Sequence, residues 1–305
     1  MIKLEGVSRW YGQVIGLNDV TCEIGPGLTA LLGMNGAGKS TMMRIITGQI
    51  RPTTGKVEIF GMQPFANPEV YRHIGYCPEI DNFYEHKSGR EFVTYLARLS
   101  GYSHDEARMR TDQVLERVGM ADRADRKIAG YSKGMRQRIK LAQAMIHEPD
   151  IILLDEPLNG LDPVGRREFI NLLAQLAEAG KTIVVSSHIL YEVEQMTRSL
   201  LLLHRGRLLA TGDLRVIRSL IDKHPHQVRI DTDEPRRAAE LLAALPNVVS
   251  FRFTPGGEAL ELEVREPDSF YDALPDLVMN KGLKVHGFTS PDNNLESVFK
   301  YLVDA

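Results

Sequence analysis

The eight residues from Gly33 to Ser40 constrain the fold of this chain more than any other feature. They read Gly-Met-Asn-Gly-Ala-Gly-Lys-Ser and match the phosphate-loop pattern G-x-x-x-x-G-K-[ST], after an expected strand and before an expected helix. The glycines let backbone N–H groups converge on phosphate oxygens, and the helix adds its positive end. Lys39 would neutralise phosphate charge, and Ser40 would bind magnesium. A glycine-rich turn with a chance lysine is the alternative, and the flanking pattern disfavours it.

Short apolar runs predict the strands of a buried sheet. Leu28 to Leu32, Ile151 to Leu154 and Thr182 to Val185 are continuous and rich in leucine or β-branched residues. A helical period from Val164 to Ala179 lies between the last two, and Gly180 is its expected C-terminal cap. Strands that alternate with helices indicate an α/β fold with a mainly parallel sheet. Antiparallel edge strands are expected at two further places, Ile2, Leu4 and Val7, and Val57 to Phe60.

Between about residues 87 and 147 the pattern becomes purely helical. Ser88 with Glu91, and Ser103 with Glu106, each match a capping box at the start of a helix. We therefore expect an inserted helical subdomain. No heptad run or internal repeat is visible, which argues against a long coiled-coil arm.

Composition narrows the class of protein. The 305 residues include 43% hydrophobic and 25% charged residues, as globular proteins do, and the formal net charge of -3 argues against a dedicated nucleic-acid binder. Two cysteines, Cys22 and Cys77, are too few for a disulfide framework and predict buried thiols in a reducing compartment. No apolar run is long enough to span a bilayer, so any membrane role would come through a partner.

A second domain is expected near the C-terminus. We expect the first domain over residues 1–217 and a smaller α+β domain over 218–305, with a linker at 222–227. The patterns predict the order β-α-β-β-α-β, which is ferredoxin-like, followed by a last helix. Its expected elements are a strand at Val228 and Ile230, helices Ala238 to Leu245 and Phe270 to Val278, a hairpin pairing Val249, Phe251 and Phe253 with Leu260, Leu262 and Val264, a strand Leu283 to Phe288, and a helix on Leu295, Val298, Phe299 and Leu302.

The strand Ile151 to Leu154 ends in two adjacent carboxylates, Asp155 and Glu156. Parallel sheets present ligands at the carboxyl ends of their strands. Asp155 would hold magnesium through water, and Glu156 would polarise a water for attack on a γ-phosphate. Without the phosphate loop, two acids that merely cap the next helix would be the better interpretation.

With these motifs the chain resembles an ATP-binding-cassette (ABC) ATPase subunit. Tyr11 matches the residue that stacks on adenine, although a buried tyrosine is an equal alternative. Ser132 and Gly134 lie in Ser-Lys-Gly-Met, which resembles the signature loop of the family. In the family this loop caps the γ-phosphate of a second subunit's nucleotide. The resemblance therefore implies two sandwiched cassettes, identical or paralogous.

Further positions carry the same resemblance. Leu161 and Asp162 match the loop that crosses between the two sites, and His188 matches the switch histidine that contacts the γ-phosphate. Glu79 stands where the family commonly has a glutamine, and it leaves open how strongly magnesium is coupled to hydrolysis. The resemblance implies ATP and Mg²⁺ as cofactors, with these residues: catalytic Lys39, Glu156 and His188; nucleotide-binding Tyr11, Gly33, Asn35, Gly36, Ala37, Gly38, Lys39, Ser40, Thr41, Glu79, Ser132, Gly134 and Asp162; and magnesium-binding Ser40, Glu79 and Asp155.

Within this family the chain resembles ABC-2 type exporter subunits. Glu79, the Ser132 loop, the run Asp155 to Pro163 and the ending Asn294 to Phe299 carry that resemblance. It implies an ATP hydrolase that works with separate polytopic membrane permeases, on the cytoplasmic face of the membrane and without nucleic acid. A non-transport ABC ATPase of DNA repair or translation is the alternative.

Two smaller features remain open. Phe83 and Tyr84 are candidate anchors for the permease, and local packing is as good an account of them. His224 and His226 flank a proline in the expected linker, where solvated histidines are more common than metal ligands.

Overall fold

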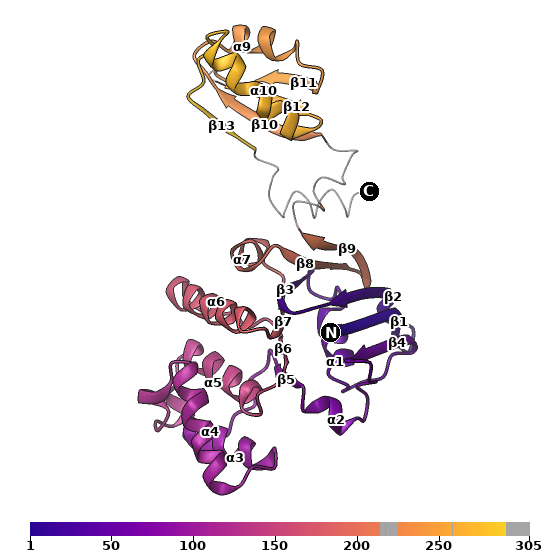
Figure 1. Ribbon diagram of the computed structural model, residues 1–305, viewed down its shortest axis with the longest axis vertical. Helices are drawn as coiled ribbons and strands as arrows, with labels where there is room; N and C mark the ends of the chain where they lie inside the picture. The colour runs from indigo at the N-terminus through magenta and orange to yellow at the C-terminus, as the bar shows by residue number, and fades with distance from the viewer. Residues whose placement is uncertain (214–216, 218–224, 258, 291–305) are drawn as a thin grey trace. The chain divides into compact units, whose positions relative to one another are not determined.

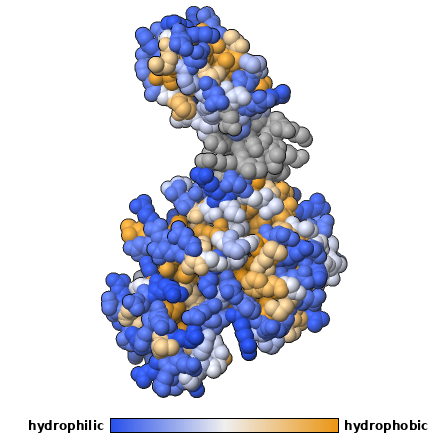
Figure 2. All heavy atoms as spheres, in the orientation of Figure 1, coloured by the Kyte–Doolittle hydropathy of each residue, from blue (hydrophilic) through white to orange (hydrophobic). Residues whose placement is uncertain are grey.

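The computed structural model describes residues 1–213, 217, 225–257 and 259–290. The chain divides into two compact units, Met1–Asp213 and Leu214–Ala305, which we describe separately. Among the described residues, no helix has the length and apolar character needed to cross a membrane. On the face shown in Figure 2, hydrophobic residues are interspersed with hydrophilic ones.

The first unit is built on a mixed sheet. Within its described residues, the strand order is β5-β6-β7-β3-β8-β9, and all neighbours are parallel except β8 and β9 (Figure 1). Every residue of β6 and β7 is buried, as expected for strands covered on both faces. The expected parallel strands are therefore confirmed. The bounds are β3 (Gly27–Leu32), β5 (Ile74–Cys77), β6 (Ile151–Leu154), β7 (Thr182–Ser187), β8 (Ser199–His204) and β9 (Arg207–Asp213).

The expected antiparallel strands are also present, and they form a sheet of their own. Its order is β2-β1-β4, with β1 (Ile2–Tyr11), β2 (Val14–Ile24) and β4 (Thr54–Ile59). A buried cluster joins this sheet to helix α1 (Lys39–Ile46) and to the main sheet, through residues such as Leu4, Met42 and Val184. The helix that follows the phosphate loop is thus fixed between two sheets. The short helix α2 (Pro68–Tyr71) follows β4.

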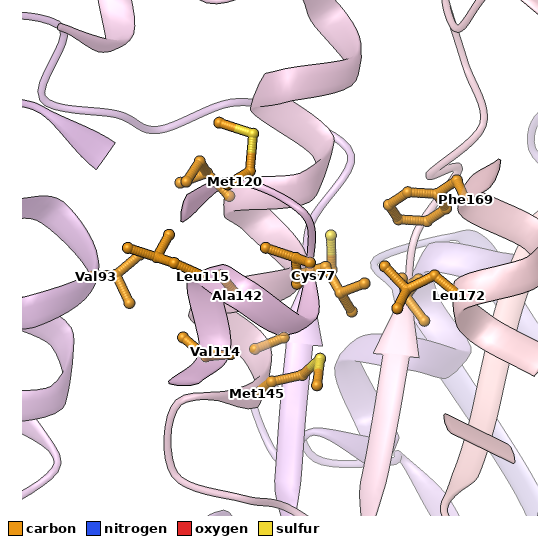
Figure 3. Close-up of a cluster of buried hydrophobic side chains, with 14 of the residues drawn as sticks. Cys77, Val93, Val114, Leu115, Met120, Ala142, Met145, Phe169 and Leu172 are labelled. Carbon is orange, nitrogen blue, oxygen red and sulfur yellow. The ribbon is translucent and has the colours of Figure 1, made fainter. Parts of the chain in front are cut away.

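The inserted segment is helical, as expected. It contains α3 (Gly89–Leu99), α4 (His104–Arg117), the 3-10 turns Ala121–Arg123 and Ile128–Gly130, and α5 (Lys133–Met145). Both capping boxes form, Ser88 with Glu91 and Ser103 with Glu106. Figure 3 shows Val93, Leu115 and Met120 of this segment in one cluster with Cys77 of β5 and Phe169 of α6 (Pro163–Glu178). This packing ties the insertion to the sheet.

Both cysteines are buried free thiols, as the sequence predicts. Burial raises the pKa of Cys22 to about 11 and that of Cys77 to about 12. Thiols of this kind are largely protonated at neutral pH and therefore poor nucleophiles.

The second unit has the predicted ferredoxin-like topology. In the part of this unit that the structure describes, the strand order is β11-β12-β10-β13, and each neighbouring pair is antiparallel. Val228, Leu260, Leu262 and Phe270 are among the residues of its core. The elements are β10 (His226–Asp231), α9 (Pro235–Leu242), β11 (Val248–Phe253), β12 (Ala259–Val264), α10 (Pro267–Met279) and β13 (Gly287–Thr289).

Two details of this unit differ from expectation. The hairpin pairs Phe251 with Leu262 and Phe253 with Leu260 as predicted, but Val248 rather than Val249 pairs with Val264, because the register shifts between Val248 and Ser250. The last strand is shorter than predicted, since Leu283 packs into the core outside the ladder. The expected final helix and His224 lie outside the described residues.

Candidate active site

The phosphate loop connects β3 to α1. Gly38 is the N-terminal cap of α1 and has φ 109°, in the region that favours glycine. A Cβ atom there would lie 2.5 Å from the carbonyl oxygen of Gly16. Glycine at this position therefore serves both the backbone conformation and the close approach of β2.

A cavity of about 470 Å³ opens at this loop. Most of the predicted nucleotide-site residues line it: Tyr11, Asn35, Gly36, Ala37, Gly38, Lys39, Ser40, Thr41, Glu79, Glu156 and His188. Gly33 and Asp155 do not line it. Gly33 is the first residue of the phosphate loop, and Asp155 directly precedes Glu156. Val14, Ile15, Gly16 and Asn159 also line the cavity, and the sequence analysis missed them.

The three predicted catalytic side chains meet at Glu156. Its Oε1 lies 3.2 Å from Lys39 Nζ, and its Oε2 lies 2.9 Å from His188 Nδ1. Glu156 and Lys39 are buried, at 7% and 6% exposure. The backbone of Glu156 has φ 48°, an unfavourable value for this residue type. Such outliers occur where the surrounding structure enforces a functional geometry.

Ser186, at the end of β7, fixes the two carboxylate residues to each other. Its Oγ donates to Asp155 Oδ1 at 2.6 Å and accepts the backbone N–H of Glu156 at 2.8 Å. All three residues are buried. The sequence analysis did not assign Ser186 a role, because the contact spans about thirty residues and depends on β6 and β7 being neighbours.

The remaining predicted residues lie in a second cavity, of about 530 Å³. Ser132, Gly134, Leu161 and Asp162 line it, and none of these lines the first cavity. Ser132 caps α5 by accepting the N–H of Met135, and Asp162 caps α6 by accepting the N–H of Gly165. The two halves of the predicted site are thus separate within one chain.

Comparison with known proteins identifies the family. The family model described as ABC transporter matches residues 17–159. The ABC transporter ATP-binding protein YxlF of Bacillus subtilis is 30% identical, and the alignment covers all of both chains. The chain belongs to the ABC transporter ATP-binding proteins. It is thus an ATPase of this family.

Other relatives of this ABC protein carry more specific names. The bacitracin transport ATP-binding protein BcrA of Bacillus licheniformis is 38% identical over 68% of each chain. The daunorubicin/doxorubicin resistance ATP-binding protein DrrA of Streptomyces peucetius is 29% identical over 98% of this chain and 91% of its own.

Solved structures of ABC cassettes resemble the first unit. The ATP-binding subunit of an ABC transporter is 33% identical with a TM-score of 0.64, covering 72% of this chain and 92% of that one. An ATP-binding cassette solved as a dimer in a post-hydrolysis state with ADP and Pi is 27% identical with the same TM-score, covering 70% and 99%.

The residues of this ABC protein fit a magnesium ion bound together with nucleotide. Among the described residues no cluster of three or more His, Cys, Asp or Glu could hold a metal by itself. The predicted magnesium ligands carry oxygens: the Ser40 hydroxyl and the Glu79 carboxylate at the cavity, with Asp155 beside Glu156. Mg²⁺ prefers such a set, one or two carboxylates completed by substrate phosphates. When bound, it would offset charge on the phosphate oxygens.

The loop that carries Glu79 is hydrogen-bonded to a buried lysine of helix α5. Lys140 of α5 is 1% exposed and donates to the carbonyl oxygens of Pro78 and Glu79 at 2.9 and 3.0 Å. It also forms an ion pair with Asp81. Nearby, burial raises the pKa of Tyr76, and the charge of Asp155 adds to the shift, so this phenol stays neutral. The Glu79 backbone is therefore anchored to the helical insertion.

Tyr11 is accessible to a ligand. Its side chain lines the first cavity and is 41% exposed, which rules out the buried-tyrosine alternative. The guanidinium of Arg9 lies 4.8 Å from the centre of its ring. Arg9 is a cation beside the expected base-binding position that the sequence analysis missed.

Proposed function

We propose that this protein is the ATPase subunit of an ABC-2 type exporter, and that it hydrolyses ATP between two cassettes. The observation that carries the proposal is the separation of the two cavities within one chain. Each chain would then supply its phosphate-loop cavity to one nucleotide and its Ser132 loop to the other. The dimer in a solved relative with ADP and Pi supports a second cassette as partner.

The chemistry assigned to this site is in-line attack of water on the γ-phosphate. Glu156 is the base that accepts a proton from the water as the new oxygen–phosphorus bond forms and ADP leaves. Lys39 offsets negative charge on the β- and γ-phosphates. His188, which bonds Glu156 Oε2, would orient this carboxylate and contact the γ-phosphate. Lys39 must exchange its contact with Glu156 for phosphate oxygens when ATP enters.

Transport is favoured over DNA repair and translation by the names of the relatives. BcrA is named for bacitracin transport and DrrA for drug resistance. We infer that this chain works on the cytoplasmic face of the membrane through separate permease subunits. In this arrangement the permease selects the transported compound.

Exposed apolar residues around α3 are the docking surface we assign to the permease. Tyr84, Tyr95 and Leu99 are 62%, 44% and 84% exposed. Phe83 differs from Tyr84, since it packs against the core of the helical insertion and its ring lies 5.2 Å from that of Phe92. Local packing therefore accounts for Phe83, and the anchor role passes to Tyr84 with its exposed neighbours.

The domain assignment follows the same proposal. We assign ATP binding to residues 1–217 and a regulatory or dimer-stabilising role to residues 218–305. The described core of the second unit is apolar, and its sheet carries no cluster of metal-ligating side chains among the described residues. This supports an accessory role without catalytic residues.

The test combines a hydrolysis block with a change at the Ser132 loop. Glu156→Gln should bind ATP and accumulate as a dimer, which light scattering after size-exclusion chromatography would detect. Adding Ser132→Asp keeps the helix cap, because Asp caps as well as Ser, but places a negative charge against the phosphates. The double variant should stay monomeric with ATP. A dimer that forms equally well in both variants would contradict the sandwich arrangement.

A further inference from the structure

A buried carboxylate lies behind the candidate active site and has no part in the chemistry above. Glu192, in the first turn of α7 (Leu190–Met196), is 1% exposed. Its Oε1 lies 3.2 Å from Arg166 Nε, and its Oε2 accepts the Ser187 hydroxyl at 3.1 Å. Burying a charge is costly unless its partners compensate, so this arrangement requires an explanation.

On one side, Glu192 holds the turn that presents His188. The Ser187 hydroxyl, which donates to Glu192, also accepts the backbone N–H of Ile189 at 3.0 Å. The second of these bonds joins Ser187 to Ile189, the residues directly before and after His188 in the chain. His188 in turn bonds Glu156 Oε2. The position of the histidine ring therefore depends on where Glu192 holds this turn.

On the other side, Glu192 reaches the loop that lines the second cavity. Arg166 lies one turn into α6, whose first turn is capped by Asp162. Its terminal nitrogen lies 3.5 Å from the carbonyl oxygen of Leu161. A chain of contacts thus runs from Leu161 through Arg166, Glu192 and Ser187 to the His188 turn.

The geometry of the Arg166–Glu192 ion pair is not the one that would stabilise the fold most. Arg166 Nε and Glu192 Oε1 are both buried, and neither has an aligned hydrogen bond among the described residues despite the 3.2 Å separation. Buried ion pairs often contribute less than apolar side chains of the same volume would. A role in geometry explains this pair better than a role in stability.

We propose that Arg166 and Glu192 are positioning residues that link the Leu161–Asp162 loop to the His188 turn. The loop that would face the second subunit then controls whether His188 is held against Glu156. Only the inter-subunit part of this inference rests on the proposed function. The contacts themselves lie within one chain.

A purely structural role makes a different prediction. Glu192 lies near the positive end of α7, and Ile189 provides no side-chain cap there, so the carboxylate could simply stabilise this helix. In that case, removing both charges together would relieve the unpaired charge that each single change leaves. Activity and stability would then recover together.

The first experiment uses Arg166→Met, Glu192→Gln and the double variant, with Arg167→Met as the control on the exposed neighbour. We expect kcat to fall about 10- to 100-fold in all three, the range for small misplacement of a reacting group. The ATP Kd of the isolated chain should stay within about twofold. The double variant should regain thermal stability over the singles and remain slow. Wild-type kcat in the folded double variant would overturn the inference.

The second experiment observes His188 directly in the nucleotide-free chain with isotope-labelled histidine. The His188 ring signal, assigned by its loss in His188→Ala, should shift in Arg166→Met and Glu192→Gln but not in Arg167→Met. An unchanged signal in both would overturn the inference. This readout needs neither a dimer nor hydrolysis. Failure of the Glu156→Gln variant to dimerise, with the signal shifted, would therefore count against the proposed function alone.

Discussion

At the scale of single residues, the candidate site centres on one strained carboxylate. Glu156 has φ 48°, a conformation whose cost is about 1–3 kcal/mol. Bonds to Ser186, Lys39 and His188 hold it there. In this conformation one carboxylate oxygen contacts Lys39 and the other contacts His188.

Lys39→Ala tests the assignment of the phosphate loop. Removing the ammonium deletes fixed positive charge from the β/γ-phosphate position and leaves Glu156 without its buried cation. We expect ATP hydrolysis to fall at least about a hundredfold. The measurement is steady-state ATPase activity of the purified protein, with the exposed Lys56→Ala as control. Wild-type turnover in the Lys39 variant would show that the site is elsewhere.

At the scale of elements, the amino ends of the main sheet carry a feature that depends on pH. His147, which follows α5, bonds the carbonyl oxygen of Ile74 at 3.0 Å. Burial is the main cause that lowers the pKa of His147 below its ordinary value of 6.5. The ring is therefore held neutral where α5 meets β5.

This shift predicts how stability changes with pH. Because the folded pKa is the lower one, the unfolded chain binds more protons between the two values, and stability falls as pH drops below about 6.5. Chemical unfolding at a series of pH values from neutral to acid would measure the slope. His147→Gln, which can still donate to Ile74, should be less pH-dependent over this range. Identical slopes in the two proteins would contradict the assignment.

Also at this scale, the exposed residues of α3 and of the preceding loop test the docking surface. Tyr84→Ala with Leu99→Ala should release the protein from membranes that contain its permease, since paired anchors contribute on the order of 2 to 4 kcal/mol. Nucleotide affinity should stay near wild type. Phe83→Ala should instead lower thermal stability, because that ring packs inside the insertion. Phe65→Ala is the control for an exposed aromatic residue. Membrane retention of the double variant would place docking elsewhere.

At the scale of the whole molecule, the two units separate catalysis from the accessory role. The residues assigned to the site all fall in the first unit, as do the phosphate-loop cavity and the cavity at Ser132. The second unit has an apolar core of its own. Each unit can therefore be expected to fold on its own core.

Truncation after Leu214 tests this division. The shortened protein should fold and bind ATP with about wild-type affinity, because every residue lining the nucleotide cavity is retained. Circular dichroism would establish folding, and a fluorescent nucleotide would measure affinity. If the truncated chain is folded but binds no ATP, the removed residues 215–305 contribute to the site.

Much of the fold was readable from the sequence because its signals are local. The phosphate loop, the buried strands, the two capping boxes and the order of the second unit are set by neighbouring residues and by periodicity. The same holds for the roles we assign to Lys39, Ser40 and Glu156, since these assignments rest on motifs next to a strand or helix. The register between strands β11 and β12 was harder to predict. An irregularity after Val248 in β11 changes which residue pairs with Val264 of β12.

Tertiary structure alone decided which distant groups meet. Ser186 bonds Asp155 and Glu156 because β6 and β7 are neighbours, and Glu192 meets Arg166 because α6 and α7 both pack on β3 and β7. Gly16 and Arg9 reach the site from strands of a separate sheet. No local pattern encodes such contacts, because the free energy that forms them comes from packing whole elements together. Sequence thus determined the chemistry that the chain carries, and the packing of sheets and helices determined the geometry in which that chemistry is held.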